Sequence, residues 1–216
     1  MTTTEMLDIF DQDMNHLGTA SRQEAHAQGL WHQTFHCWVL NPSAERGPSL
    51  LLQLRHKNKD TFPGMLDTSC AGHLLAGETI QDGVRELEEE LGLSVSLSDL
   101  LYCGRVAEEY VLSERLIDRE FNHIFVYACD KPLQEYHFQL SEISGLFMVN
   151  LREFEKLLAG GRTTISAAGV LHDELEGVTS PVVREIGRED IALNSPEYFE
   201  LLFNTIDERI IKSRGR

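Results

Sequence analysis

Apolar and polar residues alternate or recur in short blocks along the chain, and these blocks predict a mixture of strands and helices. Runs rich in β-branched and aromatic residues predict strands at Met6–Phe10, Trp31–Leu40, Ser49–Arg55, Leu100–Leu112, Glu120–Cys129 and Glu142–Val149. Asn41–Pro48 is polar and contains proline and glycine, so the strands on either side of it are expected to form a hairpin. Asp11–Leu17 is predicted to be a turn, and Thr163–Arg188 has the least regular pattern.

Helical periodicity is clearest over Glu78–Leu91. There, Ile80, Val84, Leu87 and Leu91 recur at the spacing of one helix face and predict a buried stripe. A glycine follows Leu91 directly and is expected to end the helix. Further helical segments are predicted at Arg22–Gln28, at Leu151–Leu158 and from Ser195-Pro196 to about Ile211.

The order of these elements indicates an α/β (α+β) fold, in which a mixed β-sheet is sandwiched between helices. Strands precede and follow the central helix, which disfavours a doubly wound parallel sheet. We divide the chain into an N-terminal strand and arm (residues 1–30), a main domain (31–160) and a C-terminal extension (161–216). The extension is expected to pack its helix on the same domain and to build either part of a pocket or a homodimer interface.

The 35 acidic residues outnumber the 19 basic ones, which gives a formal charge of -16. This charge repels nucleic acid and anionic membrane surfaces, so neither is expected as a partner. No segment approaches the ~20 apolar residues of a membrane span, and the acidic N-terminus does not resemble a secretory signal. Cys37 and Cys129 lie in apolar runs and are expected to be buried free thiols. A cytoplasmic location is predicted.

Three glutamates on the central helix carry the clearest chemical signal. Glu86, Glu89 and Glu90 are related by three and four positions, so their carboxylates converge on one patch. Without a cation these groups repel one another, whereas Mg²⁺ or Mn²⁺ would find oxygen ligands there. The alternative is a solvated acidic face. Acidic residues near a helix C-terminus oppose the helix dipole, however, so helix stability does not explain them.

The same stretch reads Arg-Glu-Leu-x-Glu-Glu-x-Gly-Leu over Arg85–Leu93 and resembles the Nudix box. Nudix enzymes hydrolyse nucleoside diphosphates linked to another group, so the resemblance implies a Nudix-type fold and a small-molecule diphosphate substrate. It implies that Glu89 and Glu90 are primary metal ligands and that Arg85 orients the glutamates. It gives Glu86 either a ligand role or that of general base. Six residues separate Glu78 from Arg85, whereas the usual motif has seven.

Outside this box the chain resembles type I isopentenyl diphosphate isomerase, a Nudix-fold branch, from about His26 to Phe125. The resemblance rests on the segment Phe62–His73 and on the order of histidines and acids around it. It implies metal binding by His26, His32, His73, Asp118 and Glu120, and diphosphate binding by Arg55 and Lys59. It leaves Glu120 as an alternative general base. Taken singly, each of these residues is also compatible with packing or with a solvated surface position.

The chain departs from the isomerase at the catalytic cysteine. Ala71 precedes Gly72-His73, and Cys70 lies one position earlier, where an extended chain would direct it to the opposite face. We therefore predict hydrolysis of a nucleoside-diphosphate-linked or isoprenoid diphosphate. The alternatives are an isomerase that uses Cys70 and a non-catalytic diphosphate-binding module. Candidates for stacking against the substrate are Trp31, Trp38, Tyr110 and Phe121.

Overall fold

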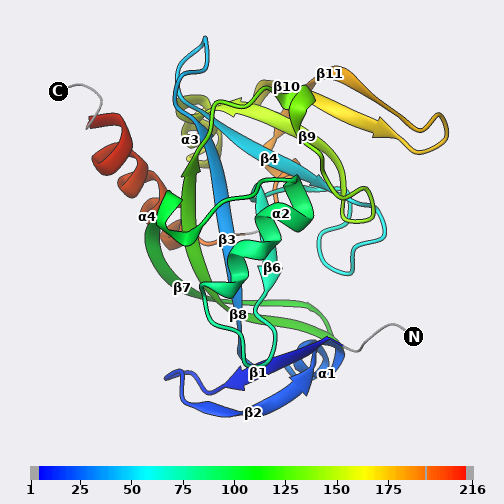
Figure 1. The fold of residues 1–216 in the computed structure, drawn as a ribbon, viewed down its shortest axis with the longest axis vertical. Helices are drawn as coiled ribbons and strands as arrows, with labels where there is room; N and C mark the ends of the chain where they lie inside the picture. The colour runs from blue at the N-terminus through cyan, green and yellow to red at the C-terminus, as the bar shows by residue number, and fades with distance from the viewer. Residues whose placement is uncertain (1–4, 193, 213–216) are drawn as a thin grey trace.

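The computed structural model describes residues 5–192 and 194–212 (Figure 1). The strands are β1 Met6–Phe10, β2 His16–Ser21, β3 His32–Asn41, β4 Ser49–Arg55, β5 Leu66–Asp67, β6 Cys70–His73, β7 Leu100–Ser113, β8 Leu116–Ala128, β9 Ile143–Asn150, β10 Thr164–Asp173 and β11 Val178–Gly187. The helices are α1 Arg22–Gln28, α2 Arg85–Leu91, α3 Leu151–Leu158 and α4 Pro196–Ile206. The mixed arrangement expected from the sequence is confirmed.

One large sheet runs in the order β11-β10-β9-β4-β3-β8-β7, with β5 paired to β4 and β6 to β3. Its β3 and β8 are parallel, whereas its other pairs are antiparallel. The predicted hairpin of β3 and β4 forms, but these strands pair only at Leu40–Leu50 and Asn41–Ser49. Beyond that point they separate, and β6 and β5 occupy their inner edges. The separation opens the sheet where the candidate site lies.

Helices cover both faces of the sheet (Figure 1). On one face, Leu87 and Leu91 of α2 pack in a buried cluster with Phe35 and Phe125. The opposite cluster contains apolar residues of α3 and α4 together with Trp38. Sheet residues therefore alternate between two apolar layers, which explains why β4 is buried along its whole length. The small sheet of β1 and β2 lies with α1 at one end of the molecule (Figure 1).

The helix that carries the glutamates is shorter than its periodicity predicts. The α-helical part begins at Arg85 and follows a 3₁₀ turn over Asp82–Val84, so Glu78 lies in the preceding loop. The Asp82 carboxylate accepts a hydrogen bond from the Thr79 backbone N–H at 2.8 Å, which stabilises a turn at this point. Gly83 packs tightly, since a Cβ there would lie 2.8 Å from atoms of Phe35 and Leu74.

Two interpretations of the strand pattern were wrong. Thr163–Arg188 is not irregular, because β10 and β11 pair in register from Thr164–Gly187 to Asp173–Val178. Its small residues weaken the alternation, and Pro181 is tolerated because β11 lies at the sheet edge. The predicted turn at Asp11–Leu17 is shorter, since β2 begins at His16 and pairs with β1.

Two further expectations can be compared with the structure. Cys37 is buried and free as predicted, whereas Cys129 is free but only partly buried. Within residues 5–192 and 194–212, no helix has the length and apolar character needed to cross a membrane.

Candidate functional site

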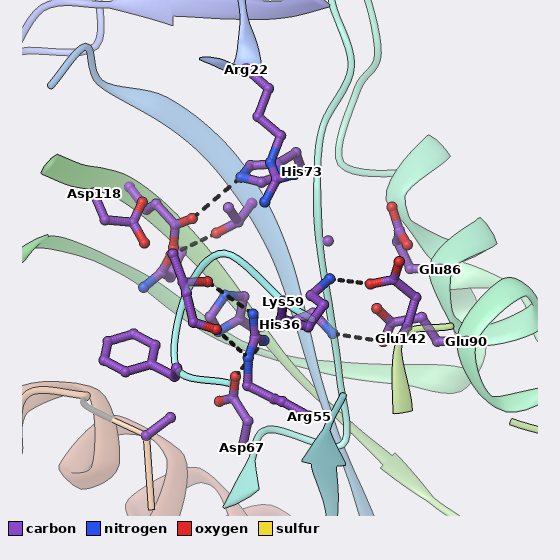
Figure 2. Close-up of a pocket in the computed structure, with 18 of the residues that line it drawn as sticks. Arg22, His36, Arg55, Lys59, Asp67, His73, Glu86, Glu90, Asp118 and Glu142 are labelled. Carbon is purple, nitrogen blue, oxygen red and sulfur yellow. Dashed lines mark hydrogen bonds and ion pairs between the residues drawn. The ribbon is translucent and has the colours of Figure 1, made fainter. Parts of the chain in front are cut away.

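A cavity of about 280 Å³ lies where β3 and β4 separate. The predicted site residues that line it are Glu86, Glu89, Glu90, Glu120, Asp118, His26, His73, Arg55 and Lys59. Figure 2 shows Glu86 and Glu90 facing His73 and Asp118 across this space. Residues more than 90 positions apart in the sequence therefore meet around one cavity. Arg85 and His32 are not part of the lining, but each contacts residues that are.

Arg85 organises the glutamates of α2. Its Nε donates to Glu78 Oε1 at 2.9 Å and its Nη2 donates to Glu78 Oε2 at 3.1 Å. Its Nη1 donates to Glu86 Oε1 at 2.6 Å and to Glu89 Oε2 at 3.2 Å. The one-residue-shorter spacing between Glu78 and Arg85 is thus compatible with a two-pronged ion pair. The guanidinium holds three carboxylates in fixed positions.

The glutamates differ in their exposure. Glu86 and Glu90 are buried, whereas Glu89 is exposed at the mouth of the cavity. Gly72 allows Glu86 to lie flat against β6, because a Cβ at this glycine would overlap the carboxylate. Glu90 Oε2 accepts a hydrogen bond from the Ala71 backbone N–H at 3.2 Å. The Glu90 carboxylate is therefore hydrogen-bonded to β6, whereas that of Glu86 packs against β6 and is held by Arg85.

Burial changes the acidity of these groups. It raises the pKa of Glu86 to about 7, and the nearby Glu89 carboxylate adds to this effect while Arg85 opposes it. Burial likewise raises the pKa of Glu90 to about 8, with a further contribution from Glu86. A bound cation would reverse this cost of ionisation, because it favours the charged form of each carboxylate.

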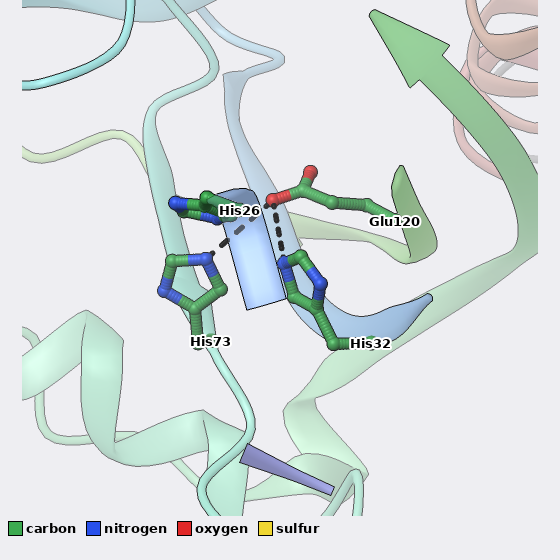
Figure 3. Close-up of side chains that lie close together, drawn as sticks. All are labelled: His26, His32, His73 and Glu120. Carbon is green, nitrogen blue, oxygen red and sulfur yellow. Dashed lines mark ion pairs between the residues drawn. The ribbon is translucent and has the colours of Figure 1, made fainter. Parts of the chain in front are cut away.

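A second group of ligand residues is assembled from four elements. His26 comes from α1, His32 from β3, His73 from β6 and Glu120 from β8. One ligand atom from each lies within 4.8 Å of the others. Figure 3 shows the rings of His32 and His73 directed at the Glu120 carboxylate, whose Oε1 lies 3.6 Å from the Nε2 atom of each.

The tautomers of two histidines are fixed by partners outside this group. The Nδ1 of His32 lies 2.9 Å from the Leu30 carbonyl oxygen, to which it donates. The Nδ1 of His73 lies 3.1 Å from Glu5 Oε1. In each case the Nε2 atom is left with its lone pair directed at the group. Backing of this kind is typical of histidines that bind metals.

Unpaired buried atoms provide a test of metal binding. The Nε2 atoms of His26, His32 and His73 and the Oδ1 atom of Asp118 are buried without a hydrogen-bond partner among the described residues. Asp118 Oδ1 lies 3.6 Å from His26 Nε2 and 4.0 Å from His32 Nε2. Because buried polar atoms normally have a hydrogen-bond partner, four unpaired atoms so close together indicate a site for a bound cation. Imidazole nitrogens with carboxylate oxygens suit Mn²⁺ or Zn²⁺ as well as Mg²⁺.

Two of the three histidines have a lowered pKa, which favours the neutral form that binds metals, whereas in His32 burial is outweighed by the nearby Glu120, which raises the pKa. Burial, together with the proximity of His73 and His32, lowers the pKa of His26 to about 4. Burial also lowers the pKa of His73, against the opposing effect of Glu5. Burial and the neighbouring Glu120 raise the pKa of Asp118 to about 8 in the absence of a cation. Asp118 therefore resembles Glu86 and Glu90 as an acid that a cation would ionise, whereas the burial of Glu120 is outweighed by the histidines around it, which lower its pKa.

The basic residues of the cavity are already paired. Arg55 is buried and donates from Nη1 to Asp67 Oδ2 at 2.9 Å and from its other nitrogens to Thr61. Lys59 Nζ forms an ion pair with Glu142. The whole lining has nine acidic and three basic side chains. A diphosphate would therefore be repelled unless cations accompany it.

The lining around β6 differs from the isomerase pattern in a definite way. Ala71 lines the cavity, whereas Cys70 is fully buried in the apolar cluster beneath α2. Burial raises the pKa of the Cys70 thiol well above its usual range, so it is a poor proton donor.

Of the four stacking candidates only Tyr110 lines the cavity, where its ring meets Phe62 edge-on at 6.4 Å. Trp31, Trp38 and Phe121 pack elsewhere.

Several lining residues were missed by the sequence analysis. They are Glu5, Arg22, Thr34, His36, Asp67, Glu108, Asn122 and Glu142. Thr34 and His36 follow His32 at every second position of β3, and Asn122 follows Glu120 in β8. This period of two places them on the face of the ligand residues and was the available signal. Glu108 likewise precedes the stacking candidate Tyr110 by two positions in β7, whereas Glu5 carries no comparable signal.

Comparisons with known proteins agree with this geometry. The family model described as the NUDIX domain matches residues 30–167. An uncharacterised Nudix hydrolase of Clostridium acetobutylicum is 36% identical over 202 residues, which cover 94% of this chain and 97% of that protein. Isopentenyl-diphosphate Delta-isomerase 2 of Photorhabdus laumondii is 30% identical over 158 residues, covering 71% and 82% respectively.

A solved structure supports the fold. The crystal structure of DR0079 from Deinococcus radiodurans matches with a TM-score of 0.52 at 21% identity, and the match covers 73% of this chain and 91% of that one. The family model and the Clostridium relative extend over most of the chain, including the glutamate helix and three of the four residues of the histidine group. The chain therefore belongs to the Nudix family.

Proposed function

We propose that the protein is a metal-dependent hydrolase of small diphosphates, which cleaves the phosphoanhydride bond. One observation carries the proposal: two separate groups of metal-ligand residues face one cavity whose basic side chains are all paired with carboxylates. The excess of acids leaves little protein charge to attract phosphate, so cations must supply the attraction.

The residues suit different cations. Glu86, Glu89 and Glu90 would hold Mg²⁺ or Mn²⁺ by oxygen atoms alone, whereas His26, His32, His73 and Glu120, with Asp118 beside them, would hold a cation that accepts imidazole. When bound, such cations polarise phosphoryl oxygens and lower the pKa of water.

The chain itself positions water and substrate. Glu86 has one oxygen held by Arg85, so the other is available to accept a proton from water as the water oxygen attacks phosphorus. Lys59 lies at the cavity wall and can exchange Glu142 for a phosphate oxygen. The Oε1 of Glu120 is directed at the histidines, which makes this residue the alternative base.

The other two functions have less support. Isomerisation needs a proton donor beside the alkene carbon, and Ala71 has none while Cys70 faces the core. A non-catalytic module would not require three glutamates fixed by one arginine.

A substrate panel tests the proposal. Phosphate-product release would be measured with ADP-ribose, nucleoside diphosphates, dinucleoside polyphosphates, sugar nucleotides and isopentenyl diphosphate, in Mg²⁺ or Mn²⁺. We expect turnover that is lost in Glu89→Gln. Conversion of isopentenyl diphosphate to its isomer, or binding without turnover, would contradict it.

A further inference from the structure

A band of polar residues continues the cavity wall beyond the histidine group. His32, Thr34 and His36 lie at alternate positions of β3, and Asn122 lies opposite Thr34 in the parallel pairing with β8. Each step of two residues advances about 6.6 Å along a strand. Thr34, His36, Asn122 and Glu108 are all buried yet line the cavity.

The band is ordered by a chain of hydrogen bonds. Thr34 Oγ1 donates to Asn122 Oδ1 at 2.6 Å, and Asn122 Nδ2 donates to Glu108 Oε2 at 2.8 Å. Glu108 Oε1 accepts from the Tyr110 hydroxyl at 3.1 Å and from the Ser195 backbone N–H at 2.5 Å. The proton of Thr34 is thus committed, while its oxygen and Glu108 Oε2 keep lone pairs for further donors.

The orientation of His36 follows from Tyr198. The indole N–H of Trp38 can only donate, so the Tyr198 oxygen accepts it at 2.9 Å. The Tyr198 proton then has a close acceptor in His36 Nδ1 at 3.0 Å, compared with 3.4 Å to Thr68 Oγ1. An imidazole that accepts a hydrogen bond at Nδ1 carries its proton on Nε2, so the N–H of His36 is at Nε2. That N–H has no partner within the described part of the chain, and Figure 2 shows His36 among the residues that line the cavity.

We propose that His36, Thr34 and Glu108 recognise hydroxyl groups on the organic part of the diphosphate substrate and so determine its specificity. The band offers one donor and two acceptors, which is the set that a pair of hydroxyl groups, as on a sugar ring, satisfies. An alkenyl chain would leave the His36 N–H unpaired and the free lone pairs of Thr34 and Glu108 unused. Sites built to hydrogen-bond a substrate hydroxyl discriminate strongly against analogues that lack it. The inference rests on the proposed function, since it names the substrate class of the same cavity.

The test compares a sugar-bearing probe, ADP-ribose, with an alkenyl probe, isopentenyl diphosphate. The variants are His36→Phe, which keeps a ring and removes its polar atoms, and Thr34→Val, which keeps the shape. The matched control is His123→Phe, because His123 is equally buried and hydrogen-bonded to Gln33 but does not line the cavity. Thermal melting establishes that each variant is folded.

We expect the ratio of kcat/KM for ADP-ribose to that for isopentenyl diphosphate to fall about tenfold or more in His36→Phe and Thr34→Val. The control should retain the wild-type ratio. An unchanged ratio in both folded variants would overturn the inference.

Binding of both probes with Ca²⁺ in place of Mg²⁺ separates this proposal from the preceding one. Absence of turnover on any probe contradicts the hydrolase alone, because the affinity ratio still reports recognition. Equal affinities of the wild-type protein for the two probes would overturn the recognition proposal even if hydrolysis were observed.

Discussion

The glutamates of α2 and the histidine group are two sets of potential metal ligands around the same cavity, but they are built differently. Glu86, Glu89 and Glu90 come from one helix, and Arg85 forms ion pairs with the first two. The histidine group comes from four elements, and its facing nitrogens are unpaired within the described residues. The first set has only oxygen ligands, and the second offers mainly imidazole.

The difference teaches how a single cavity can serve two kinds of cation. A region of oxygen ligands favours Mg²⁺, which keeps several waters and bridges carboxylates to phosphates. A region of buried, pre-oriented imidazoles favours softer cations and holds them more rigidly. We infer that the α2 glutamates act in the chemical step and that the histidine group orients the bound diphosphate.

The sharpest test of this division is Glu86→Gln. Loss of a base for the attacking water should lower kcat by about 10²- to 10⁴-fold. Glu88→Gln is the matched control, because Glu88 belongs to the same helix but is exposed and outside the cavity lining. Initial rates of phosphate release measure both. Equal rates in the two variants would break the comparison.

The histidine group should respond in affinity rather than in chemistry. His32→Gln removes a buried candidate ligand nitrogen, so the affinity for Mn²⁺ should fall by at least about tenfold. Mutation of residues that merely orient a metal ligand already has an effect of about this size. Calorimetric titration measures the affinity. His123→Gln, at a buried histidine outside the cavity, should bind Mn²⁺ as the wild type does. If His32→Gln binds Mn²⁺ normally but has the kcat of Glu86→Gln, the assigned roles are reversed.

The pH dependence of stability provides a third test. The folded-state pKa of Glu90, about 8, exceeds its ordinary value of about 4.3. A carboxyl group shifted in this direction stabilises the fold below its unfolded pKa, and that contribution is lost as the pH rises through the folded pKa. In chelator, Tm should therefore fall as the pH rises from about 5 to about 8.5.

Magnesium favours the ionised carboxylate, so the Tm difference between Mg²⁺ and chelator should grow with pH, reaching at least about 2–4 °C. In Glu90→Gln, whose side chain is neutral, this Tm difference should increase much less with pH. That comparison separates the effect of Glu90 from that of the titrating histidines. A Tm difference that is independent of pH in the wild type would contradict the account.

Much of the fold, and many of the residues that line the candidate site, could be predicted from the sequence. The glutamates share one helix, so their spacing alone brings them together. The histidine group was found only through resemblance, since no periodicity links His26 of α1 with His73 of β6. The β10–β11 pair was missed because alanines, Gly169 and Pro181 weaken the alternation that marks a strand. Both the histidine group and the β10–β11 pair depend on tertiary packing between distant segments, which local sequence patterns do not report.

The smallest effect is expected for Cys70→Ala. The thiol lies in the core beneath α2 and not in the cavity lining, so hydrolysis should stay within about twofold of wild type even if the variant is less stable. Rates at a temperature well below Tm measure this. A loss of activity as large as that of Glu86→Gln would place Cys70 in the reaction and favour isomerisation.

The most direct test of the account follows an isotope. A diphosphate that the panel identifies as a substrate would be incubated with Mg²⁺ in ¹⁸O-enriched water, and ³¹P NMR would locate the label. We predict that ¹⁸O enters a phosphate product, because water attacks phosphorus, and that Glu89→Gln incorporates no label. Label bonded to carbon rather than to phosphorus, or conversion of isopentenyl diphosphate without phosphate release, would contradict metal-dependent hydrolysis in this cavity.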